Sequence, residues 1–309
     1  MSQPTLAVVA AGAMGAAVAR RFTTAGCTVL TILDGRSAAT RARAAAAGMQ
    51  DVSMRELVTR SQWVLSILPP SDALAFATSY RDARVASVRK GSTSPSRVAF
   101  ADCNAVSPET VKQIAKLFTD SPIGFVDAGI IGGPPRDGYD PVFYASAEPE
   151  ASDLLDEFVG LSKWGIKVSP LRGEGAGVGD ASALKMSYAG ISKGITGLCA
   201  TMILAAHSSS PATAQALLHE LHTSQPLILQ RLARGIPDML PKAYRWVGEM
   251  EEISAFVGDG EGQIHQGLAR LYERIERSLK ERENGAGGED VDVLKSFVDD
   301  AKKVIEGSK

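Results

Sequence analysis

The sequence predicts an α/β domain built on a mostly parallel sheet, followed by an all-α domain. In the first half of the 309 residues, short apolar runs alternate with helix-like segments, which is typical of a parallel sheet covered by helices on both faces. After the glycine-rich stretch 170–177, strand patterns stop and long helical patterns follow. The length of the chain suits two domains.

Short apolar runs bounded by turn residues predict the strands. In chain order they are Leu6–Val9, Thr28–Leu33, Trp63–Ile67, Arg97–Asp102, Gly124–Ala128, Val142–Ala145 and Ile166–Val168. Helical patterns lie between most of these runs, the first over Ala16–Ala25.

The second half predicts helices only. The first and longest, Asp180–His207, is rich in Ala, Gly and Ser. Small residues permit close approach of a neighbouring helix, so we expect this helix to be buried. Further helices are expected at Pro211–Ser224, Gln225–Arg234, Tyr244–Val257, Glu261–Glu283 and Val291–Ile305.

Composition excludes several classes of protein. A net charge of -2 argues against a nucleic-acid binding surface. The cysteines Cys27, Cys103 and Cys199 are far apart and odd in number, which favours a reducing, cytoplasmic compartment. The first residues lack the basic region of a secretory signal. The longest apolar stretch, Ile195–Ala206, is too short to span a bilayer.

One turn has the pattern of a phosphate-binding loop. It joins the first predicted strand to its helix and contains Ala10, Ala11, Gly12, Ala13, Met14 and Gly15. This is G-x-G-x-x-G with Ala10 in place of the first glycine. Backbone N–H groups at such a helix N-terminus point toward a pyrophosphate. The turn therefore predicts dinucleotide binding, and the alternative is an ordinary strand-to-helix turn with glycines for packing.

Turn-forming or polar residues follow the other predicted strands as well. They include Asp34, Leu68–Pro70, Asp102–Asn104 and Asp127. Because parallel strands present their carboxyl ends at one edge of the sheet, these residues are expected to converge on one ligand crevice. We interpret Asp102 and Asp127 as turn and capping residues rather than acid–base catalysts.

With this domain order, the motifs are similar to those of the β-hydroxyacid dehydrogenase superfamily, which includes 6-phosphogluconate dehydrogenase and 3-hydroxyisobutyrate dehydrogenase. The resemblance covers nearly the whole chain. It implies a Rossmann-type NAD(P)-binding domain over residues 1–172. It also implies an all-helical substrate and dimerisation domain over residues 173–309, beginning with the long helix. The segment Arg245–Glu252 resembles a branch of the family with a distinct C-terminal domain.

Three further segments match the family with departures. Leu68–Pro69 resembles the strand end beside the cofactor ribose. Asn104 stands where the family often has serine, and the resemblance implies roles in cofactor binding and catalysis. Ile131 replaces a serine that helps to hold the substrate, which leaves the backbone amides of Gly132 and Gly133 as donors to a carboxylate.

The segment Gly179–Ile191 resembles the family's catalytic helix, and Lys185 matches its lysine. A lysine can remove a hydroxyl proton or return one to a carbonyl oxygen. Tyr188 lies one turn later on the same face and is expected to orient the substrate. Ala189 replaces the usual asparagine. Lys193 lies two turns beyond Lys185 and does not match the motif.

The residues after the second strand indicate the type of nicotinamide cofactor. Asp34 at this position could accept hydrogen bonds from a ribose 2′-hydroxyl of NAD. Gly35, Arg36 and Ser37 instead align with a family motif that holds the 2′-phosphate of NADP, with Arg41 one turn further on. We predict NADP as the cofactor, with NAD as the alternative.

The predicted function is an NADP-dependent oxidoreductase. It transfers a hydride between the nicotinamide and the hydroxyl carbon of a small β-hydroxy acid or sugar acid, with Lys185 as general acid and base. The first alternative is an imine or carbonyl reductase on the same fold, against which Lys185 argues. The second is a nucleotide-binding protein without activity, favoured by Ala10, Ile131 and Ala189.

The expected partners are a small carboxylate substrate and a second copy of the chain. No nucleic acid and no membrane is expected. His219 and His222 share a helix face, but further ligands are not placed with them, so no metal site is predicted.

Overall fold

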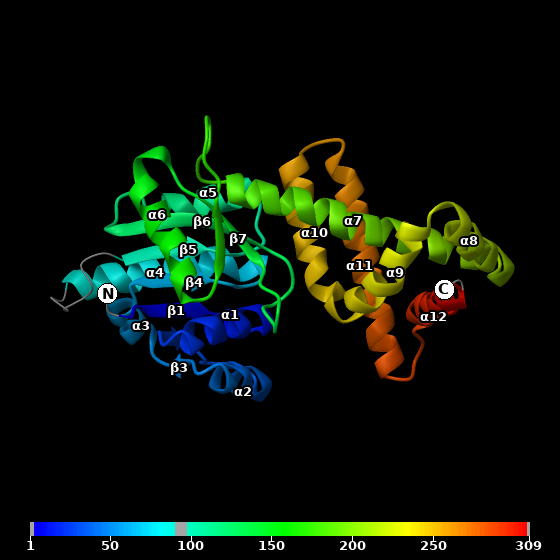
Figure 1. Cartoon of the computed structure of the whole chain (residues 1–309), viewed down its shortest axis with the longest axis horizontal. Helices are drawn as coiled ribbons and strands as arrows, with labels where there is room; N and C mark the ends of the chain where they lie inside the picture. Colours follow the sequence, from blue (N-terminus) through cyan, green and yellow to red (C-terminus); the bar gives the residue numbers. More distant parts are fainter. Residues whose placement is uncertain (1–2, 90–97, 308–309) are drawn as a thin grey trace. The chain divides into compact units, whose positions relative to one another are not determined.

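The computed structural model describes residues 3–89 and 98–307. The chain divides into two compact units that meet in the sequence between Met186 and Ser187 (Figure 1). The first unit contains the sheet and the second is helical, so the predicted fold class is confirmed. The last strand ends at Pro170, just before the predicted domain boundary at 172/173, and the first turns of the following helix still pack in the first unit.

Within the described residues, the first unit forms an eight-stranded sheet in the order β3-β2-β1-β4-β5-β6-β7-β8. Neighbouring strands run parallel except β6 and β7. The strands are β1 Thr5–Val9, β2 Thr28–Thr31, β3 Gln50–Asp51, β4 Trp63–Ser66, β5 Val98–Asp102, β6 Ile123–Ile131, β7 Val142–Ser146 and β8 Lys167–Pro170. The strand order reverses between β1 and β4, the position at which open α/β sheets bind ligands.

Every predicted strand is present, with some ends displaced. β2 ends at Thr31 because the chain then enters a turn, and β6 continues to Ile131 because its last residues pair with β7. Arg97, the predicted first residue of the fourth strand, lies outside the described residues. The short strand β3, Gln50–Asp51, was not predicted because its two polar residues carry no apolar pattern.

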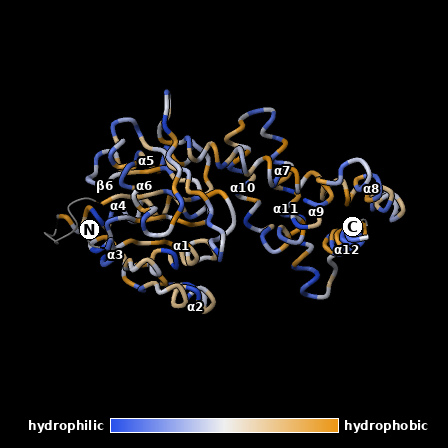
Figure 2. Tube along the Cα trace, in the orientation of Figure 1, coloured by the Kyte–Doolittle hydropathy of each residue, from blue (hydrophilic) through white to orange (hydrophobic). Residues whose placement is uncertain are grey.

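Both faces of the sheet are buried, as expected of parallel strands. Along β1, Leu6 and Val8 pack into one core cluster, and Ala7 and Val9 pack into another. Residues of α1, α2 and α6 complete the first cluster, and residues of α3, α4 and α5 complete the second. These helices are α1 Ala13–Thr24, α2 Ala38–Ala46, α3 Met54–Arg60, α4 Pro70–Arg89, α5 Pro108–Lys116 and α6 Ser152–Gly160, with short 3-10 turns at η1 Pro149–Ala151 and η2 Leu161–Trp164. Figure 2 shows hydrophobic residues along the strands between these helices.

The second unit contains the rest of α7 and the helices that follow it, and each predicted helix is confirmed in place. The elements are α7 Asp180–Ser209, α8 Pro211–Ser224, α9 Pro226–Met239, η3 Leu240–Lys242, α10 Ala243–Val257, α11 Gly262–Glu283 and α12 Glu289–Gly307. α10 packs along α11, and α12 packs against α8 and α9. The largest difference is in α9, which continues beyond the predicted end at Arg234.

One face of α7 is packed in the second unit. A Cβ on Gly197 would lie 2.8 Å from the hydroxyl oxygen of Tyr272, so glycine permits this close approach. Lys193 forms a partly buried ion pair with Glu249, and its ammonium lies 5.2 Å from the ring centre of Trp246. Lys193 therefore has a structural role in the helical core.

The other face of α7 is exposed. Its large side chains Tyr188, Ile191, Leu198 and Met202 are each more than half exposed. Within a single chain, α7 is therefore buried on one face only, because small residues do not reveal which face of a helix has a partner in the same chain.

By length and composition alone, α7 is long enough and apolar enough to cross a membrane. The sequence analysis considered only the shorter stretch Ile195–Ala206 and did not test the whole helix. Core helices pass the same test, and α7 carries an internal ion pair to α10.

Candidate active site

A row of polar side chains crosses the sheet. Ser66 of β4, Asp102 of β5, Asp127 of β6 and Ser146 of β7 are consecutive partners in the strand register. All four are buried. A buried polar row of this kind is costly unless its groups are hydrogen-bonded, and the following contacts satisfy it.

Asp127 connects the start of α7 to the sheet through hydrogen bonds. Its carboxylate accepts hydrogen bonds from the backbone N–H groups of Gly179 and Ser182, both at 3.0 Å, and from the Ser182 hydroxyl at 2.8 Å. The Ser146 hydroxyl donates to Asp127 and accepts from the N–H of Ala181. Burial raises the pKa of Asp127, and these donors oppose that rise. The interpretation of Asp127 as a capping residue is confirmed, and the helix that it caps is the one that carries Lys185.

Asp102 and Asn104 form a second network at the ends of β4 and β5. Asp102 accepts from the backbone N–H of Asn104 at 3.0 Å and from its side-chain amide at 2.9 Å. The Asn104 amide also donates to the Ser66 hydroxyl, and its oxygen accepts from the N–H of Leu68 at 2.6 Å. Asp102 is thus a turn residue, as expected, and Asn104 holds the segment Leu68–Pro69 in place. The Asn104 side chain is buried and directed into the protein.

Burial raises the pKa of Asp102 to about 7. The hydrogen bonds from Asn104 and the positive charge of Lys185 lower it, while the neighbouring charge of Asp127 raises it further. Burial also raises the pKa of the adjacent Cys103 thiol. The charge of Lys185 therefore acts on the buried acidic groups at the end of β5.

Lys185 lies in the second turn of α7 and is half-buried. Gly129 of β6 sets its distance from the sheet: a Cβ at Gly129 would lie 2.7 Å from the carbonyl oxygen of Ala181 and 3.1 Å from the Cβ of Lys185. Only a glycine lets this helix approach the strand so closely. Sequence reasoning missed Gly129 and Ser182, because their importance depends on contacts between residues far apart in the chain.

The phosphate-loop prediction agrees with the local geometry. A Cβ at Gly15 would lie 1.9 Å from the carbonyl oxygen of Ala10, so this glycine is required for close packing of α1 on β1. At Gly12 a Cβ would meet no atom within 4 Å, which leaves space beside the backbone. Gly12 also provides no side-chain cap for α1, so the first N–H groups face an open position. Ala10 can replace the glycine of the motif because its φ angle is not positive; among the described residues only glycines have a positive φ angle.

These features fit the pyrophosphate of a dinucleotide. The helix begins at Ala13, Met14 lies in its first turn, and Ala11 of the loop is fully buried. Arg43 of α2 donates to the carbonyl oxygen of Ala11 at 3.3 Å, which ties the loop to the neighbouring helix.

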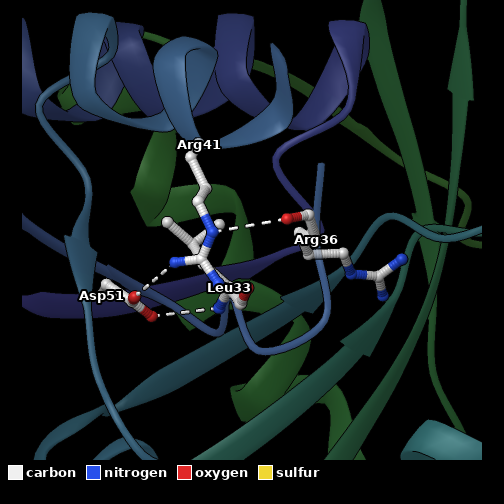
Figure 3. Close-up of polar contacts among 4 residues, drawn as sticks. All are labelled: Leu33, Arg36, Arg41 and Asp51. Atoms are coloured by element: carbon white, nitrogen blue, oxygen red, sulfur yellow. Dashed lines mark hydrogen bonds and ion pairs between the residues drawn. The ribbon is translucent and has the colours of Figure 1, made fainter. Parts of the chain in front are cut away.

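The turn between β2 and α2 presents Asp34, Gly35, Arg36 and Ser37, all exposed. Ser37 is the N-cap of α2 and accepts a hydrogen bond from the N–H of Thr40. The side chain of Arg41 is directed back onto the turn, whereas the guanidinium of Arg36 points away from it (Figure 3). The structure thus separates two arginines that the sequence pattern grouped together.

The predicted substrate segment follows β6. Ile131 is partly exposed, and Gly132 has a φ of 125°. A Cβ at Gly132 would lie 2.1 Å from the hydroxyl oxygen of Tyr139, and that oxygen accepts the N–H of Gly133 at 3.2 Å. The amide of Gly133 therefore already has a protein partner. Tyr139 carried no sequence signal, because it follows the glycines in an irregular loop.

Tyr188 follows Lys185 by one turn of α7, and its side chain is 53% exposed. Its helical spacing from Lys185 is as predicted.

Among residues 3–89 and 98–307, no group of three metal-ligating side chains is present, and the His219 ring contacts Gln215.

The family model described as the NAD binding domain of 6-phosphogluconate dehydrogenase matches residues 5–165, just over half of the chain. A domain of unknown function, DUF1932, matches residues 209–275. No curated protein matches the chain.

Several solved structures share the fold. MTH1747, a conserved protein of unknown function described as similar to 3-hydroxyacid dehydrogenases, is 25% identical with a TM-score of 0.61, and the match covers 89% of this chain and 97% of that one. The 3-hydroxyisobutyrate dehydrogenase of Mycobacterium tuberculosis is 17% identical with a TM-score of 0.62, covering 88% and 94%. An imine reductase from Myxococcus stipitatus in complex with NADP+ is 19% identical with a TM-score of 0.53, covering 96% and 100%.

The family match confirms the resemblance drawn from the motifs and covers strands β1 to β7, the phosphate loop and the polar row. The chain belongs to the family of the NAD binding domain of 6-phosphogluconate dehydrogenase, whose members are NAD(P)-dependent dehydrogenases and reductases.

Proposed function

We propose that this protein is an NADP-dependent oxidoreductase that acts on the hydroxyl carbon of a small β-hydroxy acid or sugar acid. The observation that carries the proposal is the placement of Lys185. Asp127 holds the first turn of α7, Gly129 brings that helix against β6, and Lys185 follows in the next turn. A lysine on a helix that is fixed against a strand is suited to proton transfer.

Lys185 is the proposed general acid and base. In the oxidative direction its neutral amine accepts the proton of the substrate hydroxyl, and in the reductive direction its ammonium donates a proton to the carbonyl oxygen. The nicotinamide, when bound, supplies or accepts the hydride. Asp102 carries a pKa of about 7 and interacts electrostatically with Lys185, so its ionisation modulates the charge around the amine.

The proposed cofactor site extends from the phosphate loop to the β2–α2 turn. The N–H groups after Gly12 would bind the pyrophosphate, and Leu68–Pro69 would border the nicotinamide ribose. Asn104, whose buried side chain is bonded to Ser66, Leu68 and Asp102, would hold that segment rather than touch the cofactor or take part in catalysis. Asp34 and Arg36 lie on the turn that would meet the adenosine ribose. Arg36 supports NADP, because an exposed guanidinium can bind a phosphate through two parallel hydrogen bonds.

The substrate is proposed to be a small carboxylate bound near Ile131 and Gly132, with Tyr188 orienting it. Whereas a serine at position 131 would donate a hydrogen bond, Ile131 cannot, so a donor elsewhere must complete carboxylate recognition.

We also propose a cytoplasmic homodimer. The exposed apolar side chains Ile191, Leu198 and Met202 on α7 support this assembly.

A cofactor-reduction screen tests the function. Purified protein is incubated with NADP+ or NAD+ and a panel of β-hydroxy acids and sugar acids, and absorbance of the reduced nicotinamide is followed. Turnover with at least one acid, faster with NADP+, is expected. Turnover only in the reverse direction with cyclic imines would assign an imine reductase instead. Tight NADPH binding without turnover on either panel would identify a nucleotide-binding protein that has lost activity.

A further inference from the structure

The turn that follows β2 is closed by its own backbone. The N–H of Arg36 donates to the carbonyl oxygen of Leu33 at 3.0 Å. Gly35 has a φ of 69°, in the left-handed region that glycine adopts without strain. The turn exposes Asp34 and Arg36, the two side chains that bear on the choice between NAD and NADP.

Arg41, in the first half of α2, binds both ends of this turn. Its Nη2 donates to the carbonyl oxygen of Leu33 at 2.6 Å, and its Nε donates to the carbonyl oxygen of Arg36 at 3.3 Å (Figure 3). Nε and Nη2 form one edge of the planar guanidinium, an edge that often binds phosphates and carboxylates. Here the protein backbone occupies that edge.

Asp51 completes the arrangement from β3. Its Oδ1 accepts the N–H of Leu33 at 3.0 Å, and its Oδ2 lies 3.5 Å from Nη1 of Arg41. β3 pairs with β2 through Thr31 and Asp51, so the carboxylate is held by the sheet. Leu33 is thus fixed at its N–H by Asp51 and at its carbonyl oxygen by Arg41.

The guanidinium of Arg36 is arranged differently. It points away from Arg41, Leu33 and Asp51 in Figure 3, and the side chain is exposed. One arginine therefore fixes the turn while the other faces outward from it.

We propose that Arg41 and Asp51 are positioning residues for cofactor specificity: together they hold the turn so that Arg36 meets the 2′-phosphate of NADP. This inference rests on the NADP preference in the proposed function. Arg41 acts through the backbone of the turn and makes no contact with the phosphate. Its removal frees a turn that contains a glycine, and the cost of ordering that turn then falls on NADP binding.

A double-mutant cycle tests the proposal by binding alone. Kd values for NADPH and NADH are measured by fluorescence titration for the wild type, Arg36→Ala, Arg41→Ala and Arg36→Ala/Arg41→Ala. Binding of 2′,5′-ADP and 5′-ADP by calorimetry provides the same comparison without the nicotinamide. Arg55→Ala removes an exposed positive charge from the neighbouring helix α3 and is the matched charge control.

Arg36→Ala is expected to weaken NADPH binding by about 10- to 100-fold, the range of a charge-assisted hydrogen-bonded contact. Arg41→Ala is expected to weaken it by about tenfold, with NADH affinity changed by less than about twofold. Arg41→Lys, which can reach one carbonyl oxygen, should recover part of the loss. In the Arg36→Ala background, Arg41→Ala should cause no further loss of NADPH affinity.

Additive losses in the double variant would mean that Arg41 contacts the phosphate itself and would overturn the positioning role. An unchanged ratio of NADPH to NADH affinity in Arg41→Ala, or the same change in Arg55→Ala, would overturn it too. A wild type that binds NADH more tightly than NADPH would refute the proposed cofactor, and the inference would fall with it. If the wild type prefers NADPH and Arg41→Ala keeps that preference, the positioning role of Arg41 is refuted, while NADP as the proposed cofactor stands.

Discussion

Replacing Gly129 by alanine should disturb catalysis through the helix that carries Lys185. The added Cβ would lie 2.7 Å from the carbonyl oxygen of Ala181 and 3.1 Å from the Cβ of Lys185. A carbon and a carbonyl oxygen normally stay about 3.3–3.6 Å apart, so α7 and β6 must separate by roughly 0.6–0.9 Å. Such overpacking typically costs about 1–3 kcal/mol of unfolding free energy.

The same displacement moves the Lys185 amine. A misplacement of about 1 Å in a reacting group can lower the rate by about 100-fold. We therefore expect kcat of Gly129→Ala to fall about 10- to 100-fold on the substrate that the hydroxy-acid screen identifies. The Kd for NADPH should change by less than about twofold, because β4 and β5 separate the β6 strand of Gly129 from β1 and β2, which precede the phosphate loop and the β2–α2 turn.

Gly160→Ala is the matched control. Gly160 has a φ of -59° and a ψ of -20°, and a Cβ there would meet no atom within 4 Å. This alanine should leave kcat unchanged and should raise the unfolding free energy by up to about 1 kcal/mol. If Gly129→Ala keeps both the wild-type kcat and the wild-type stability, the reasoning that places α7 by close packing on β6 is refuted.

Two further predictions concern the phosphate loop and the buried acids. Gly15→Ala places a Cβ 1.9 Å from the carbonyl oxygen of Ala10 and should abolish measurable NADPH binding in a fluorescence titration; retained affinity would contradict the assigned loop. Burial raises the pKa of Asp102 from 3.8 to about 7, so between these pH values the folded protein holds a proton that the unfolded chain has released. Protonated Asp102 therefore favours the folded state at low pH, and this contribution to the unfolding free energy is lost as the pH rises toward 7. Urea unfolding should show a steeper fall in stability from pH 4 to pH 7 for the wild type than for Asp102→Asn, and parallel curves would refute this origin of the pH dependence.

Much of the fold could be predicted from the sequence because its signals are local. The buried strands, the phosphate-loop turn and the helices of the second unit each have an apolar period or a turn residue that marks them. β3 had neither, since it is a short polar strand whose pairing with β2 depends on distant contacts. The exposed face of α7 was also missed, because amphipathic pattern does not reveal how many neighbours a helix has.

The candidate site was predictable in position but not in the detail of its contacts. The resemblance to the family's catalytic helix singled out Lys185 near the start of α7, yet it could not reveal that Asp127 caps this helix across the sheet. The family motif also grouped Arg36 with Arg41, whereas in the structure the Arg41 side chain is directed back onto backbone carbonyl oxygens. The direction of a side chain follows from three-dimensional packing, and a sequence motif carries no information about that packing.

Replacement of the proposed general acid and base tests the account most directly. Lys185→Met keeps an unbranched side chain and removes the amine, and Lys163→Met, an exposed lysine of the same unit, is its control. We predict that Lys185→Met loses turnover by at least about 1,000-fold while its Kd for NADPH stays within about threefold of the wild type, and that the control keeps full activity. Turnover by Lys185→Met near the wild-type rate would contradict the proposed mechanism.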